Sequence, residues 1–206
     1  MATAWKSKSG NTCITMTDIL DVASKSGGPK ITKIRELKNR GPYLPQTDFY
    51  KPLREGIIKV HQSGKPKSTL QAILLKVNAK KLANYKAALD GYEKWWGTRT
   101  LTWFDPPSGS YSGSGFEIRI NPELGLEIGG QRQIIKLFLR DQNVSKLRID
   151  LMNALMAQSL PGSMNATCNV LDVRRSTPIG APANCAALIS VVDAELATIA
   201  KVWPTV

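Results

Sequence analysis

The sequence predicts a single α+β domain, in which a helical, basic first half packs against a mostly antiparallel sheet that two C-terminal helices help to cover. Three observations predict this class. Apolar residues recur at helical spacing up to about residue 96, alternate with charged residues between 116 and 139, and return to helical spacing from residue 145. The 206 residues suffice for one domain, residues 1–206, with its own hydrophobic core.

Two short helices are expected near the start of the chain. Residues 1–10 are small, polar and basic, which is typical of a flexible tail. The stretch Asp18–Ala23 predicts a helix that Thr17 caps and that the Gly/Pro-containing segment Ser26–Pro29 ends. A second helix is expected over Thr32–Arg40, with mostly lysine and arginine on its surface.

Longer helices follow. Asp48 can cap a helix over Phe49–His61, where apolar residues recur every three or four positions. Ser68 can cap the longest helical stretch, Thr69–Trp96. Its apolar spacing is irregular near Asn78, which indicates two helices that meet at an angle.

The middle of the chain has the character of a sheet. The segment 105–115 is rich in Pro, Gly and Ser and is expected to form an exposed loop. Strands are expected near residues 100–104, 116–120, 124–128, 132–139 and 168–173.

Gly129-Gly130 predicts a tight hairpin, and counting outward from it sets the register of its strands. Ile128 then lies opposite Gln131, Glu127 opposite Arg132, and Glu123 opposite Lys136. One face of the hairpin carries only aliphatic residues and is expected to be the core face: Leu124, Leu126, Ile128, Ile135, Leu137 and Leu139. The other face is expected to be solvated, and it carries Glu123, Glu127, Arg132, Lys136 and Arg140 together with Ile134 and Phe138.

Two helices are expected after the hairpin, on either side of the last strand. The first spans about 145–158, with leucines at helical spacing, and Pro161-Gly162 ends it. The second spans about 182–202 and is rich in alanine, so it can dock closely on a sheet.

The charge of the chain is distributed unevenly. Residues 1–100 contain 19 Lys/Arg against 7 Asp/Glu, whereas residues 101–206 contain 9 of each, so the first half carries the whole net charge of +12. Such asymmetry favours an acidic partner, most simply DNA or RNA. Ten residues in two clusters are the candidate phosphate contacts: Lys30, Lys33, Arg35, Lys38 and Arg40 in the first, and Lys65, Lys67, Lys76, Lys80 and Lys81 in the second.

The composition of these clusters favours sequence-tolerant binding. Lysine predominates in the second cluster, and lysine contacts phosphates as a point charge without the bidentate geometry that reads bases. Four aromatic residues could stack on bases if they are exposed: Tyr43, Tyr50, Trp103 and Tyr111. Two alternatives remain open, namely a solvated basic surface without a ligand and a protein-interaction module with an acidic partner.

The order of the expected elements over about residues 69–175 resembles the αβββαβ core of the PD-(D/E)xK nuclease superfamily. The resemblance implies a metal-dependent nuclease or an inactive relative, with Lys136 as the lysine of the motif and Glu123 or Glu127 as a carboxylate. Mg²⁺ or Mn²⁺ would be the cofactor under this reading alone. However, Ile134 occupies the position where the motif has an acidic residue. The simpler interpretation is that Glu123–Lys136 and Glu127–Arg132 are cross-strand ion pairs.

Other chemistry finds little support in the sequence. His61 is the single histidine and ends an expected helix, which disfavours a catalytic role. The three cysteines, Cys13, Cys168 and Cys185, are far apart and lack metal-ligand spacing, so neither a metal site nor a disulfide is expected. We therefore expect no cofactor.

The chain begins without an apolar leader, and no run approaches the roughly 20 apolar residues of a membrane span. A cytoplasmic protein without a membrane partner is expected.

Overall fold

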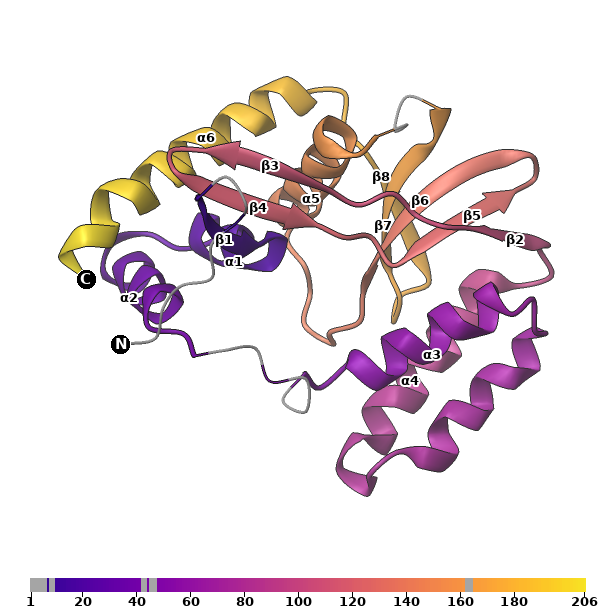
Figure 1. Cartoon of the computed structure of the whole chain (residues 1–206). Coiled ribbons are helices and arrows are strands. Elements are labelled where there is room, and N and C mark those ends of the chain that lie inside the picture. The colour runs from indigo at the N-terminus through magenta and orange to yellow at the C-terminus, as the bar shows by residue number, and fades with distance from the viewer. Residues whose placement is uncertain (1–6, 8–9, 42–43, 45–47, 162–164) are drawn as a thin grey trace.

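The structure is a computed structural model that describes residues 7, 10–41, 44, 48–161 and 165–206 (Figure 1). Most of the expected tail, residues 1–10, lies outside these ranges. The helices are α1 (Met16–Ala23), α2 (Gly27–Lys38), α3 (Lys51–Gln62), the 3-10 helix η2 (Lys67–Lys76), α4 (Ala79–Trp96), α5 (Lys146–Ser159), α6 (Cys185–Val202) and the 3-10 turn η4 (Trp203–Thr205). The strands are β1 (Thr12–Thr15), β2 (Leu101–Phe104), β3 (Gly109–Gly113), β4 (Phe116–Ile120), β5 (Leu124–Ile128), β6 (Gln131–Phe138), β7 (Thr167–Asp172) and β8 (Thr177–Gly180).

The α+β class is confirmed, but the described strands form two sheets instead of one. A five-stranded sheet has the order β2-β5-β6-β7-β8, and a three-stranded sheet has the order β1-β4-β3. Each sheet contains one parallel pair, β6 with β7 and β1 with β4. The expected strand 116–120 therefore pairs with β1 and β3, and not with the 124–128 hairpin.

The β5–β6 hairpin has the register that the sequence predicts. Ile128 lies opposite Gln131 and Glu127 opposite Arg132. The Glu123 N–H donates to the carbonyl of Ile135, which continues the ladder beyond β5. The alternation of aliphatic and charged residues was therefore sufficient to fix this pairing.

Both faces of the five-stranded sheet are covered, which corrects the expectation of one solvated face. The expected core face packs with Leu53, Ile57, Leu70, Tyr85, Leu89 and Tyr92 of α3, η2 and α4. The opposite face presents Ile134 and Phe138 to α5, α6 and the three-stranded sheet, and both side chains are buried. This face was expected to be solvated because most of its residues are charged, although Ile134 and Phe138 belong to the core.

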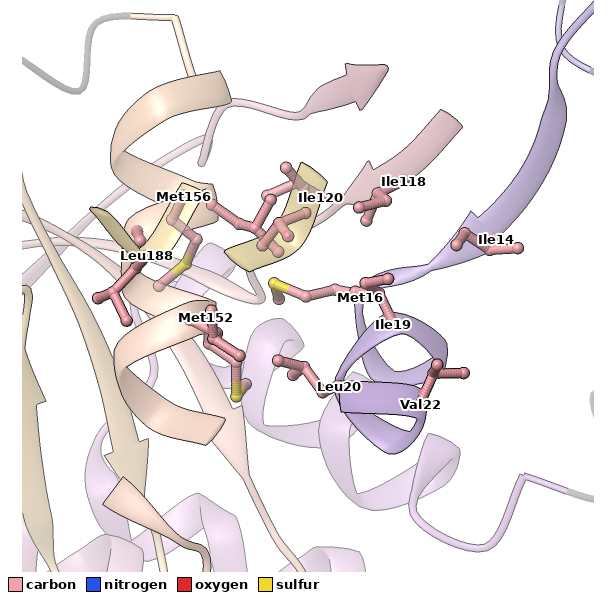
Figure 2. Close-up of a cluster of buried hydrophobic side chains, with 14 of the residues drawn as sticks. Ile14, Met16, Ile19, Leu20, Val22, Ile118, Ile120, Met152, Met156 and Leu188 are labelled. Atoms are coloured by element: carbon pink, nitrogen blue, oxygen red, sulfur yellow. The ribbon is translucent and has the colours of Figure 1, made fainter. Parts of the chain in front are cut away.

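Helix α1 packs into the hydrophobic cluster on the Ile134/Phe138 face of the five-stranded sheet (Figure 2). Its buried residues Met16 and Leu20 point toward Met152 and Met156 of α5, and Ile19 lies in the same cluster. Thr15, and not Thr17, caps the helix, because the Thr15 hydroxyl accepts from the Asp18 N–H while the Asp18 carboxylate accepts from the Thr15 N–H.

One other helix boundary differs from expectation, and one agrees with it. Helix α2 already begins at Gly27, so Gly27-Gly28-Pro29 forms its first turn instead of a break. Proline is compatible with that turn because the first N–H groups of a helix have no partner inside it. The irregularity near Asn78 is confirmed as a junction, where η2 ends at Lys76 and the Asn78 side chain caps α4.

Three strands were missed. β3 lies within the expected loop 105–115, and its glycines have a packing role: a Cβ on Gly109 would stand 2.2 Å from the Ser159 carbonyl oxygen. β1 and β8 are four-residue strands at sheet edges, too short for a periodicity to be read. No helix in the described ranges has the length and apolar character that crossing a bilayer requires.

Candidate polyanion-binding surface

The first basic cluster is on and just after α2, and most of its charge is neutralised within the protein. The Lys30 ammonium contacts both carboxylate oxygens of Glu195 on α6, at 2.7 and 2.8 Å. The Lys38 ammonium donates to the carbonyl oxygens of Trp203 and Val206. These contacts attach α2 to the C-terminal segment, so the two lysines have a structural use.

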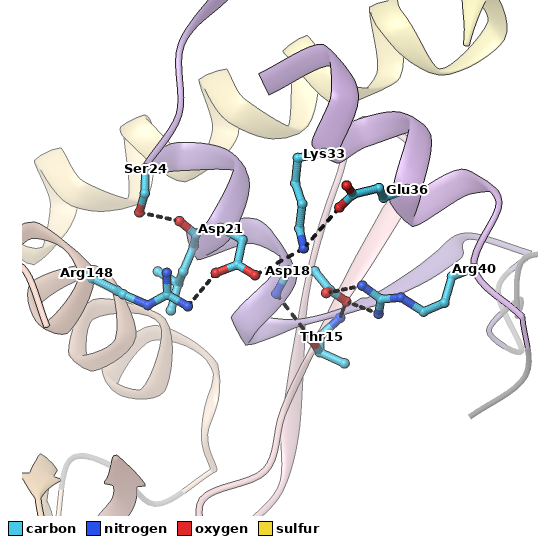
Figure 3. A network of polar contacts seen from close by, with 9 residues as sticks. Thr15, Asp18, Asp21, Ser24, Lys33, Glu36, Arg40 and Arg148 are labelled. Carbon is cyan, nitrogen blue, oxygen red and sulfur yellow. Dashed lines mark hydrogen bonds and ion pairs between the residues drawn. The ribbon is translucent and has the colours of Figure 1, made fainter. Parts of the chain in front are cut away.

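Lys33 and Arg40 join a polar network beneath α2 (Figure 3). Lys33 Nζ lies 3.2 Å from Asp21 Oδ2, and Arg148 of α5 contacts the other oxygen of the same carboxylate at 2.6 Å. Arg40 forms a two-pronged pair with the buried carboxylate of Asp18, at 2.6 and 2.9 Å. Arg35 is exposed, and its guanidinium makes no hydrogen bond or ion pair with another described residue.

Burial by itself would raise the pKa of Asp21. The hydrogen bonds and positive charges of Arg148 and Lys33 outweigh that effect and lower the pKa. Asp21 is therefore ionised at neutral pH, and its carboxylate compensates the positive charges of Lys33 and Arg148 on either side. A phosphate could recruit Lys33 only by breaking this arrangement.

The second basic cluster is in a different part of the molecule, the layer formed by α3, η2 and α4 (Figure 1). We call residues 48–99 the helical layer. Lys65 and Lys80 are exposed, and their ammonium groups make no hydrogen bond or ion pair with another described residue. Lys67 donates to the Gly97 carbonyl, and Lys81 donates to the Phe49 carbonyl and lies 5.0 Å from the Phe49 ring centre. The side chain of Lys76 lies outside the described part of the structure.

The two clusters do not converge on one surface. α2 lies at the end of the molecule that holds α6 and β1, whereas the helical layer packs on the far side of the five-stranded sheet (Figure 1). The layer contains 11 Lys/Arg against 4 Asp/Glu, a surplus of seven of the twelve net positive charges of the chain. The positive surplus is thus concentrated in the layer, while the charges of α2 are largely compensated.

Within the layer, exposed lysines align most clearly on the solvent-facing side of α4. Lys80 and Lys94 are both exposed, and their separation of fourteen positions corresponds to about 21 Å of helix and to a rotation within about 40° of whole turns. The two lysines therefore share one face, and the exposed Ala83 and Ala87 lie between them. Small side chains at these positions allow a chain-like ligand to approach the helix closely.

Two members of this surface were not among the predicted phosphate contacts. Lys59 on α3 and Lys94 near the end of α4 are exposed, and neither ammonium group makes a hydrogen bond or ion pair with another described residue. Lys94 lies three residues before Gly97, whose carbonyl holds Lys67, so Lys65, Lys67 and Lys94 belong to the same end of the layer. Helical spacing relative to Lys80 could have identified Lys94.

The aromatic candidates are used inside the fold. Tyr50 stacks on Tyr85 with ring centres 6.3 Å apart, and Trp103 Nε1 donates to Asp105. The Tyr111 hydroxyl donates to Asp193 at 2.7 Å; burial, and then this carboxylate, raise the pKa of Tyr111 to about 12. Tyr43 lies outside the described residues. None of the three described rings is thus a free stacking platform.

The residues of the nuclease resemblance form a structural ion pair. Lys136 contacts Glu123 at 2.6 Å, and the second oxygen of Glu123 accepts from the Leu137 N–H at 2.8 Å. Glu127 is four residues further along β5, roughly 13 Å away, and Arg132 opposite it lies over the Phe104 ring at 4.6 Å. The carboxylates are therefore not brought together.

The remaining candidates also have structural environments. His61 is buried, and its Nε2 is 2.7 Å from the Tyr92 hydroxyl while its ring stacks on Trp96 at 4.5 Å. The three cysteines are free thiols. Within the described residues, no three His, Cys, Asp or Glu side chains are close enough together to hold a metal ion.

The chain matches no protein-family model and has no significant match among curated proteins.

Proposed function

We propose that the protein binds a polyanion, most simply the phosphodiester backbone of DNA or RNA, through the helical layer. The observation that carries the proposal is the surplus of seven positive charges in residues 48–99, together with four exposed lysines whose ammonium groups make no hydrogen bond or ion pair within the described residues. These are Lys59, Lys65, Lys80 and Lys94. The proposal keeps the second basic cluster as the binding surface and leaves α2 aside, because its cations already have partners.

The layer is suited to recognising a backbone and not a base sequence. The separation of about 21 Å between Lys80 and Lys94 corresponds to about six phosphates of one strand. Lysine contacts phosphates without bidentate geometry, and the outer face of α4 presents alanine between its lysines, which gives no group that distinguishes one base from another. We therefore expect sequence-tolerant binding that depends strongly on salt.

The test compares two variants with the same change in net charge. The layer variant carries Lys59→Gln, Lys65→Gln, Lys80→Gln and Lys94→Gln. The control variant carries Lys25→Gln, Arg35→Gln, Arg140→Gln and Lys201→Gln, four exposed cations outside the layer. Binding of fluorescently labelled single- and double-stranded DNA of mixed sequence is measured by anisotropy at 50 and 200 mM salt.

The wild-type affinity should fall steeply between the two salt concentrations, because bound phosphates release counterions on complex formation. The layer variant should bind at least tenfold more weakly than the control variant at 50 mM salt, with similar unfolding midpoints for both. Equal losses in the two variants would refute the layer as the site. Binding of polyglutamate in preference to DNA and RNA would instead support an acidic protein partner.

A further inference from the structure

A second surface, separate from the helical layer, has the features of a small-molecule site. A cleft of about 690 Å³ opens between α1, α2 and the connection from β6 to α5. Its volume falls within the range of roughly 300–1,000 Å³ that small-molecule sites occupy. The lining residues come from segments more than a hundred positions apart: Asp21, Lys25, Gly28, Pro29, Thr32, Lys33, Glu36, Arg140 and Gln142.

Part of the cleft wall is a fixed ion-pair network (Figure 3). Asp21 is held by Arg148 at 2.6 Å and by Lys33 at 3.2 Å, and Lys33 also lies 3.8 Å from the more exposed Glu36. These contacts compensate Asp21, so its carboxylate does not repel an anion as a free carboxylate would. The network also keeps α1, α2 and α5 together around the cleft.

Two cations of the cleft have no such compensation. Lys25 follows α1 and Arg140 follows β6, and both are exposed. Neither side chain makes a hydrogen bond or ion pair with another residue in the described ranges. With Lys33 and the adjacent Arg148, the cleft gathers four cations against Asp21 and Glu36.

The lining also has no aromatic side chain and, apart from the proline ring, no apolar one. An apolar ligand would bury little apolar surface in such a site and would bind weakly. It offers instead the Thr32 hydroxyl, the Gln142 amide and the Glu36 carboxylate, which can exchange hydrogen bonds with hydroxyl groups.

From these features we infer that the cleft binds a small phosphate ester that carries hydroxyl groups, of the sugar-phosphate class. Lys25 and Arg140 contact the phosphate, whose oxygens accept charge-assisted hydrogen bonds. The hydroxyl groups of the ligand donate to Glu36 and exchange hydrogen bonds with Thr32 and Gln142. The inference concerns different residues from the polyanion proposal and does not depend on it.

The experiment follows backbone amide shifts by NMR while ribose 5-phosphate, ribose or inorganic phosphate is added to the full chain. Ribose 5-phosphate should shift the amides of Lys25, Gly28, Thr32 and Gln142, with saturation in the millimolar range or below. The double variant Lys25→Ala, Arg140→Ala should weaken this binding at least tenfold. Arg35→Ala, which removes an exposed cation of α2 outside the cleft lining, should leave it unchanged.

Five results would contradict the proposed site or its ligand class. Absence of saturable shifts at these amides up to 10 mM ribose 5-phosphate, on the order of the weakest useful affinities, would refute the site. So would equal binding by ribose, or undiminished binding in the double variant. Equal affinity for inorganic phosphate would refute the sugar part of the proposal. If the double variant weakens oligonucleotide binding as strongly as ribose 5-phosphate binding, the phosphate belongs to a nucleic acid and the small-molecule assignment is wrong.

Discussion

At the scale of single residues, His61 is the group whose titration should govern stability below neutral pH. Burial lowers its pKa from 6.5 to about 4. The unfolded chain therefore binds a proton at His61 between these two pH values, and the folded protein does not. Stability contributed by the neutral imidazole is present above pH 6.5 and is lost as the pH falls toward 4.

The resulting prediction is a pH-dependent loss of free energy that belongs to one side chain. Between pH 7 and pH 4.5 the wild type should lose about 2–3 kcal/mol more unfolding free energy than His61→Gln, in which nothing titrates at this position. Urea unfolding at the two pH values measures the difference. Parallel losses in both proteins would show that His61 is protonated in the folded state.

The two glutamates of the β5–β6 hairpin should behave differently despite their similar positions in the sequence. Glu123 is 9% exposed and accepts from Lys136 and from the Leu137 N–H, whereas Glu127 is exposed. Glu123→Ala leaves the Leu137 N–H without its acceptor and the Lys136 ammonium with the Asn121 carbonyl but no carboxylate, and it should cost about 2–4 kcal/mol. Glu127→Ala should unfold with nearly the wild-type urea midpoint, and equal effects of the two substitutions would contradict the structural role of Glu123.

At the scale of elements, the packing of α4 against the turn after β7 depends on the absence of a side chain at Gly91. A Cβ there would lie 2.2 Å from the Val173 carbonyl oxygen and 3.1 Å from Arg174 Cα. The Ser176 hydroxyl donates to the Gly91 carbonyl at 2.8 Å, and Arg174 donates to the Asn84 side chain at 2.7 Å. The helix and the turn therefore meet backbone to backbone.

Gly91→Ala should consequently destabilise the protein by more than about 2 kcal/mol, although alanine is favoured over glycine in a helix by about 1 kcal/mol. Gly28→Ala in α2 is the matched control, because a Cβ there meets nothing within 4 Å. Its unfolding temperature should equal or exceed that of the wild type. A stabilised Gly91→Ala protein would mean that α4 does not contact the Val173 carbonyl in solution.

Elements with local signals could be predicted from the sequence. Alternation and the Gly129-Gly130 turn predict the β5–β6 register, and the irregular spacing at Asn78 predicts the junction of η2 and α4. The strand β3 could not be predicted, because its Gly/Ser composition resembles a loop and only pairing with β4 makes it a strand. The burial of the second sheet face could not be predicted either, because only Ile134 and Phe138 indicated it among several charged residues.

At the scale of the whole molecule, the sequence showed which half carries the charge but not which cations remain uncompensated. Lys30 and Lys38 contact groups 165 residues or more away, and no local pattern reports such partners. Lys65 and Lys80 were predicted contacts and are exposed in the structure, whereas Lys59 and Lys94 were not among the predicted contacts. Glu195, Asp18 and Asp21 compensate the positive charges on and just after α2. The proposed interface is therefore the helical layer.

A lysine-acetylation footprint, read by mass spectrometry with and without saturating mixed-sequence DNA at low salt, tests the central claim most directly. Lys59, Lys65, Lys80 and Lys94 should become protected when DNA is bound. Lys25 and Lys201, which are exposed outside the layer, should react at unchanged rates. Protection that is uniform over the surface, or that is confined to lysines outside residues 48–99, would contradict the helical layer as the polyanion-binding surface.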